Sequence, residues 1–119
     1  MDVPPNALRF AHPSTQRWFA ETFPQATHAQ ALAWPAIASG ASTLLLAPTG
    51  SGKTLSAFLV AIDKLMFGPP AEQPGTRVLY LSPLKALGVD VERNLAGPLA
   101  GITQQAEVDG AGHRVPRLR

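Results

Sequence analysis

Apolar residues recur along this 119-residue chain in two patterns, one with the period of a helix and one with the continuity of a buried strand. From Lys53 to Met66 they follow helical spacing, which predicts an amphipathic helix closed by Gly68. Residues 43–47 and 78–81 are short, continuous apolar runs between turn residues, which predicts strands buried on both faces. Strand, helix and strand in this order form a βαβ unit.

Two helices are predicted before this unit. Pro13 suits a first helical position and indicates a short helix over residues 13–22. Thr27 with Gln30 three residues later matches a capping box, so a second helix should start there and end at Gly40. The residues expected to face inward from this second helix are Leu32, Trp34 and Ile37.

A last helix is predicted after the second strand. Ser82 is a suitable cap and Pro83 suits the first turn, so this helix should run to about Leu95. From Gly101 the apolar pattern dissolves, and we interpret residues 104–119 as a connector or a truncated tail. Its basic side chains, which are expected to contact mainly water, are Arg114, Arg117 and Arg119.

Composition narrows the class of protein. Apolar residues make up 45% of the chain and charged residues only 15%, against a usual charged share of about 25%, so we expect a globular chain. The net charge of +2 permits an anionic partner without indicating one. Cysteine is absent, and no leader or membrane-spanning run is visible. We therefore expect a cytoplasmic protein with no disulfide, no zinc–thiolate site and no membrane partner.

Between the first predicted strand and the helix after it, the chain reads Ala-Pro-Thr-Gly-Ser-Gly-Lys-Thr. This placement predicts a phosphate-binding loop, because glycines let successive N–H groups face phosphate oxygens at a positive helix end. Lys53 is the predicted catalytic residue, reaching the β- and γ-phosphates of ATP, and the Thr54 hydroxyl is the predicted Mg²⁺ ligand. The predicted ATP-binding residues of the loop are Thr49, Gly50, Ser51, Gly52, Lys53 and Thr54.

A glycine-rich turn that binds nothing is the alternative, but such a turn does not need lysine and threonine at these positions. Ala47 stands where the general phosphate-loop pattern begins with glycine. With that departure the motif resembles the first motif of superfamily 2 helicases. Phe23, seven residues before Gln30, resembles the start of the adenine-recognition motif of DEAD-box-type helicases, although Ala26 stands where those proteins usually carry proline.

Residues 33–40 and 81–95 look like the corresponding segments of the large helicase-related (Lhr) family. The resemblance spans roughly residues 8–103. It implies an α/β fold: a partial, RecA-like P-loop domain over residues 23–103, with parallel strands and flanking helices. Residues 1–22 would form a helical lead-in to it.

The resemblance also assigns roles to single residues. Gln30 would hydrogen-bond the adenine edge and Phe23 would pack on the ring; the alternatives are a plain capping role and a plain core role. The residues that would line the backbone of single-stranded DNA or RNA are Ser82, Pro83, Leu84 and Lys85. An ordinary helix start and an ordinary surface lysine are the alternatives there.

We therefore expect the ATP-binding N-terminal part of an ATP-dependent helicase, a nucleic-acid-dependent ATPase. The chain lacks the Asp-Glu motif that positions the attacking water, and the second RecA-like lobe of the family. Activity should depend on those missing parts. Another P-loop enzyme, such as a small-molecule kinase or a AAA-type ATPase, and a non-catalytic nucleotide-binding fragment are the alternatives.

Overall fold

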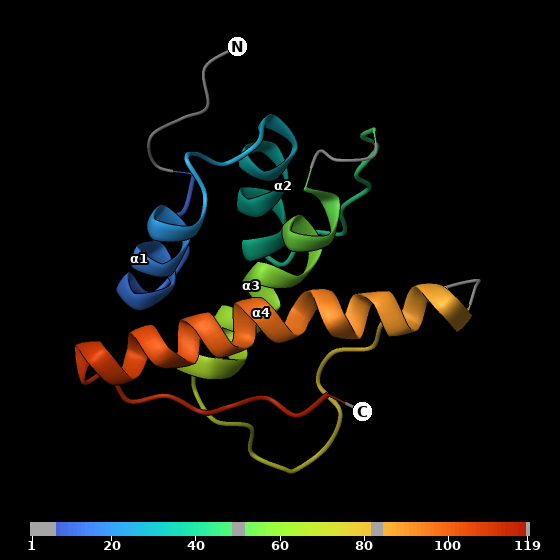
Figure 1. The fold of residues 1–119 in the computed structure, drawn as a ribbon. Helices are drawn as coiled ribbons and strands as arrows, with labels where there is room; N and C mark the ends of the chain where they lie inside the picture. The colour runs from blue at the N-terminus through green and yellow to red at the C-terminus, as the bar shows by residue number, and fades with distance from the viewer. Residues whose placement is uncertain (1–6, 49–51, 82–84, 119) are drawn as a thin grey trace.

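The computed structural model of the chain describes residues 7–48, 52–81 and 85–118, with only the backbone described over residues 85–90. Within these ranges all regular structure is helical (Figure 1). The four helices are α1 (Pro13–Thr22), α2 (His28–Ala38), α3 (Lys53–Phe67) and α4 (Lys85–Asp109). Helix α2 packs on α3, α1 packs on α4, and α4 also contacts α3. The long α4 thus lies across the other helices (Figure 1).

The predicted α/β fold with parallel strands is wrong for the described residues. Residues 43–47 and 78–81 are irregular, and Figure 1 shows the two segments apart. Leu44 and Leu46 are 83% and 84% exposed, and Leu79 and Leu81 are 76% and 81% exposed. An extended segment becomes a strand only when its N–H and C=O groups pair with a neighbouring strand. The predicted burial of these apolar runs is therefore also wrong, because within the described ranges neither run pairs with a strand.

The core lies where the four helices meet. Trp34, Leu59, Met66 and Ile102 are completely buried. The first three lie in helices that the sequence predicts, whereas Ile102 lies beyond the predicted end of the last helix. Aromatic rings of α1 and α2 meet in this core, because the Phe19 ring centroid lies 5.6 Å from that of Trp34. Burial of such apolar side chains contributes about 1.5–3 kcal/mol each.

Helix α4 is longer than the sequence predicts. It was expected to end near Leu95, yet it continues to Asp109. Its buried residues are Leu95, Leu99, Ile102 and Ala106, a helical stripe that runs straight through Gly101. A side chain at Gly101 would collide with α1, because a Cβ there would lie 2.2 Å from Nε1 of Trp18. The glycine allows the indole of α1 to pack directly against the α4 backbone.

A polar cluster fixes the start of α1. Oδ1 of Asp63, a buried residue on α3, accepts hydrogen bonds from the His12 backbone N–H at 2.9 Å and from the Thr15 hydroxyl at 2.7 Å. The Nδ1 atom of His12 accepts from the Ser14 N–H and caps the helix. These contacts join α1 to α3 through groups that would otherwise be unsatisfied at the helix start.

Asp109 joins the same end of α1 to α4. It accepts a 2.7 Å hydrogen bond from the Ser14 hydroxyl and forms an ion pair with Arg17 at 2.7 Å. The hydrogen bond from Ser14, followed by those from Gln105 and Arg17, holds the pKa of Asp109 below its ordinary value. The carboxylate form is therefore the one that this contact stabilises.

The segment after α4 runs back beside α4 and contacts the C-terminal end of α3 (Figure 1). The Arg114 backbone N–H donates to the Met66 carbonyl at 3.0 Å, and the Arg114 guanidinium donates to the Gly68 carbonyl. The expectation that this arginine contacts mainly water is wrong. A cation at the carbonyl end of a helix is favourable, since it pairs with unsatisfied carbonyls and with the negative end of the helix dipole.

Candidate nucleotide-binding site

The predicted loop–helix junction is present at the N-terminus of α3. Gly52 is the N-cap residue with φ 78° and ψ 26°, a left-handed conformation that favours glycine. Lys53 and Thr54 form the first turn of α3, and both are exposed to solvent. Thr49, Gly50 and Ser51 lie outside the described residues. What the structure describes is therefore the helix end of the loop, with its lysine and threonine accessible.

Gln30 connects this junction to α2. Its side chain is buried, its Oε1 atom accepts from the Thr27 N–H at 2.9 Å, and the Thr27 hydroxyl accepts from the Gln30 N–H at 3.2 Å. The predicted capping box is therefore confirmed. In addition, Gln30 Nε2 donates to the Gly52 carbonyl at 3.4 Å. One side chain thus links the starts of α2 and α3.

Ser56 is a residue of this junction that the sequence reading missed. It is completely buried, and both its backbone N–H and its hydroxyl donate to the Gly52 carbonyl at 3.0 Å. The signal available in the sequence was its position four residues after Gly52, where a serine hydroxyl reaches back along a helix. Gln30 also restricts Gly52, because a Cβ there would lie 2.3 Å from Gln30 Nε2.

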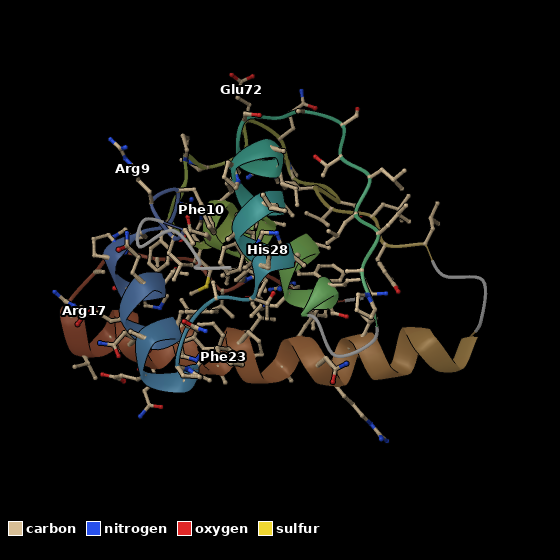
Figure 2. The ribbon with its side chains drawn as sticks, turned by 90° about the horizontal axis from the view of Figure 1, so that it is seen from above. Arg9, Phe10, Arg17, Phe23, His28 and Glu72 are labelled. Atoms are coloured by element: carbon tan, nitrogen blue, oxygen red, sulfur yellow. The ribbon has the colours of Figure 1, made fainter. Side chains whose placement is uncertain are left out.

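Phe23 lies just after α1 and is partly exposed (Figure 2). Its ring centroid lies 4.9 Å from that of Phe19 and 5.9 Å from that of Trp18, so the ring extends the aromatic core to the surface. Phe23 is 37% exposed, which leaves part of the residue available for stacking. The packing accommodates both the core role and the adenine role.

The predicted nucleic-acid-binding residues fall mostly outside the described part of the chain. Ser82, Pro83 and Leu84 are not described, and Lys85 is the first residue of α4. The predicted strand contact therefore stays a prediction. The described part of α4 begins at Lys85, two residues after Pro83 in the sequence.

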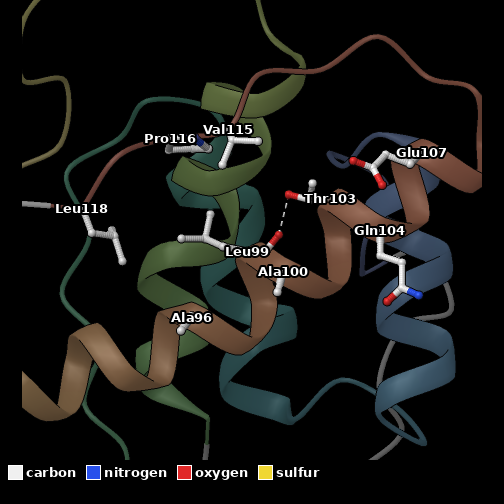
Figure 3. Close-up of a pocket in the computed structure, with 9 residues that line it drawn as sticks. All are labelled: Ala96, Leu99, Ala100, Thr103, Gln104, Glu107, Val115, Pro116 and Leu118. Atoms are coloured by element: carbon white, nitrogen blue, oxygen red, sulfur yellow. Dashed lines mark hydrogen bonds between the residues drawn. The ribbon is translucent and has the colours of Figure 1, made fainter.

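A shallow groove of about 580 Å³ lies elsewhere, between α4 and the segment after it (Figure 3). It contains none of the predicted site residues. Its lining is mainly apolar and consists of Ala96, Leu99, Ala100, Thr103, Gln104, Glu107, Val115, Pro116 and Leu118.

Acidic and histidine side chains do not gather into a metal-binding group of three or more anywhere in the described ranges. Mg²⁺ in nucleotide sites needs no such cage, since it is held by one or two protein oxygens, phosphate oxygens and water. The exposed Thr54 hydroxyl fits that donor set. Among the described helices, none is long and apolar enough to cross a membrane.

The amino-acid sequence of this chain is similar to those of known helicases. The family model of DEAD/DEAH box helicases matches residues 27–115. The Lhr helicase/probable uracil glycosylase of Mycolicibacterium smegmatis is 61% identical over 98 residues, which cover 81% of this chain and 6% of that protein. The Lhr helicase/uracil glycosylase of Escherichia coli K12 is 46% identical over 100 residues, covering 78% of this chain and 6% of its relative. The ATP-dependent helicase Lhr-Core of Methanothermobacter thermautotrophicus is 43% identical over 101 residues, which cover 83% of this chain and 12% of that protein.

A solved structure is also similar. The Mycobacterium smegmatis helicase Lhr bound to ssDNA and AMP-PNP matches with a TM-score of 0.82 and 53% identity, covering 94% of this chain and 14% of that one. The chain thus spans only a small part of the length of these proteins. The family model nevertheless covers the loop–helix junction, since it matches residues 27–115, and the chain belongs to the DEAD/DEAH box helicase family.

Proposed function

We propose that this chain supplies the ATP-binding part of an Lhr-type ATP-dependent helicase, a nucleic-acid-dependent ATPase. The observation that carries the proposal is the junction at α3. Gly52 turns into the helix in a left-handed conformation, and Lys53 and Thr54 stand exposed on the first turn. Helix N-termini attract phosphate because their N–H groups are unsatisfied and their dipole end is positive.

Lys53 is the proposed catalytic residue, since its ammonium group can neutralise charge on the β- and γ-phosphates. The Thr54 hydroxyl is the proposed protein ligand of Mg²⁺, which supplies further charge neutralisation when it is bound. Thr49, Gly50, Ser51 and Gly52 are proposed to donate backbone N–H groups to the phosphates. ATP is the proposed nucleotide; the similar M. smegmatis structure holds AMP-PNP.

Gln30 and Phe23 are proposed to recognise adenine. The capping bonds do not exhaust the Gln30 amide, because Nε2 carries two N–H donors and Oε1 has two lone pairs. One donor is used on Gly52 and one lone pair on Thr27. One donor and one acceptor therefore remain, which is the pair that an adenine edge requires. The capping role and the adenine role are compatible.

Single-stranded DNA or RNA is the proposed partner, contacted through its backbone by Ser82, Pro83, Leu84 and Lys85. The Lhr structure similar to this chain is bound to ssDNA. Turnover is proposed to require an Asp-Glu motif and a second RecA-like lobe as well, because the attacking water must be aligned and the developing charge stabilised. A cytoplasmic location remains a prediction from the sequence.

The test uses a chimera in which residues 1–119 replace the matching segment of the M. smegmatis relative. Lys53→Ala should weaken ATP binding by about 10- to 100-fold in calorimetry, because a charge-assisted contact is lost. Lys64→Ala is the matched control: it removes a lysine from the far end of α3, where Nζ donates to the Ala38 carbonyl at 3.3 Å. Equal ATP affinity in the Lys53 variant and the control would overturn the proposal.

A further inference from the structure

The Gly52 carbonyl receives an unusual set of donors. The Ser56 N–H and the Ser56 hydroxyl each donate at 3.0 Å, and Gln30 Nε2 donates at 3.4 Å. A carbonyl oxygen has two lone pairs, so three donors from two helices fully occupy this acceptor. Ser56 and Gln30 are both buried, which removes the competition of water for these bonds.

The orientation of this carbonyl also sets the orientation of the next N–H group. The peptide unit between Gly52 and Lys53 is planar and trans, so its C=O and N–H point in opposite directions. The carbonyl points along α3 toward Ser56. The Lys53 N–H must therefore point out of the N-terminal end of α3, the end of a helix that attracts phosphate.

A hydroxyl bond back to the residue four positions earlier is not special in itself. The Thr22 hydroxyl donates to the Trp18 carbonyl at 2.6 Å, and the Thr103 hydroxyl donates to the Leu99 carbonyl at 2.6 Å. Such bonds can simply satisfy the hydroxyl. The Ser56 bond differs in its acceptor, which belongs to the N-cap of the phosphate-loop helix and is shared with a side chain from another helix.

We propose that Ser56 and Gln30 form a clamp on the Gly52 carbonyl that positions the phosphate loop, and that this clamp strengthens triphosphate binding whatever base is attached. The inference rests on the proposed function and goes beyond base recognition. It gives Gln30 a second role and gives Ser56 a role as a positioning residue. Neither side chain has to touch the phosphates for the clamp to act.

The probe that separates the clamp from base recognition is inorganic tripolyphosphate, which carries no base. In the chimera described above, Ser56→Ala and Gln30→Ala should each weaken tripolyphosphate binding by about 3- to 10-fold, the loss expected for one or two neutral hydrogen bonds. Thr103→Ala is the matched control, because it removes the same kind of hydroxyl bond from α4. The control variant should bind tripolyphosphate like the parent chimera.

Thermal unfolding is measured on the same samples, so that a general loss of stability is seen separately from a loss of affinity. If Ser56→Ala and Gln30→Ala bind tripolyphosphate as tightly as Thr103→Ala, the clamp is refuted. A loss confined to ATP in the Gln30 variant would likewise refute it and leave base recognition alone. Failure of the proposed function is distinct, since Lys53→Ala would then leave the binding of both ligands unchanged.

Discussion

Substitution of Gly52 by alanine perturbs the junction in two separable ways. The backbone at Gly52 has φ 78°, where an L side chain is strained, and the new Cβ would lie 2.3 Å from Gln30 Nε2 and 3.0 Å from Gln30 Cδ. The Gln30 side chain would have to move. It would then lose its bond to the Gly52 carbonyl and its capping bond to the Thr27 N–H.

The magnitude follows from these two parts. A non-glycine residue in the left-handed region costs about 1–2 kcal/mol. Each neutral hydrogen bond lost costs about 0.5–1.5 kcal/mol. Gly52→Ala should therefore lower the free energy of unfolding by about 2–5 kcal/mol, a large part of the roughly 5–15 kcal/mol typical of a folded domain.

Gly40→Ala is the matched control, because Gly40 has φ 86° and a Cβ there would meet nothing within 4 Å. It should cost only the strain, about 1–2 kcal/mol. In urea unfolding followed by circular dichroism, the Gly52 variant should be the less stable of the two by about 1–3 kcal/mol. Adding Gln30→Ala to the Gly52 variant should cost less than Gln30→Ala costs in the parent, because Gln30 has already lost these two bonds in the Gly52 variant and its truncation also relieves the collision. Equal stability of the two glycine variants would refute the reasoning.

Three further predictions concern the helices that support the site. Asp63→Ala should lower the free energy of unfolding by about 3–5 kcal/mol in urea titrations, whereas Asp63→Asn keeps an oxygen acceptor and should cost clearly less; equal losses would contradict the bonding described. The lowered pKa of Asp109 means that its contribution to stability is present above its unfolded pKa and is lost as the pH falls through the lower folded value. Asp109→Asn should therefore flatten the fall in melting temperature between about pH 5 and 2, and an unchanged slope would refute this. Gly101→Ala should lower the melting temperature through collision with Trp18, while Gly97→Ala, whose Cβ would meet nothing within 4 Å, should not; similar melting curves would contradict the packing.

Signals carried by neighbouring residues predicted the helices well. The capping box of Thr27 and Gln30 is present, and the helix after the loop begins at Lys53 as its apolar spacing indicates. These signals are local, because a cap and a helical stripe are completed within one or two turns. The sequence predicted less well where the buried face is ambiguous: Leu32, expected to face inward, is 64% exposed. α2 is apolar on most sides, so spacing alone does not select its buried face.

Features that depend on distant parts of the chain could not be predicted. An apolar run such as residues 43–47 indicates burial, but a strand also needs a partner, which the run itself does not name. The same limit applies to the tertiary contacts of Asp63 and Arg114, whose partners lie on other segments. The extension of α4 beyond Leu95 also depends on packing against a distant residue, since Gly101 lies against Trp18 of α1.

At the candidate site, too, the sequence indicates local features, whereas contacts between distant residues appear only in the structure. The loop motif predicts Lys53 and Thr54 as site residues because the chemistry of such a loop is tied to a fixed local spacing. The bond from Gln30 to Gly52 spans 22 residues of sequence, and only the structure reveals it. Ser56 became visible as part of the site only once the Gly52 carbonyl was seen to accept from both helices.

Stimulation of ATP hydrolysis by single-stranded DNA is the measurement that tests the central claim most directly. The chimera that carries residues 1–119 within the M. smegmatis relative is assayed with and without single-stranded DNA, beside its Lys53→Ala and Lys64→Ala variants. We predict DNA-stimulated hydrolysis in the chimera and in the Lys64 variant, and its loss in the Lys53 variant. A folded chimera whose ATP hydrolysis does not respond to single-stranded DNA, or does not depend on Lys53, would contradict the assignment of this chain to the ATP-binding part of a helicase.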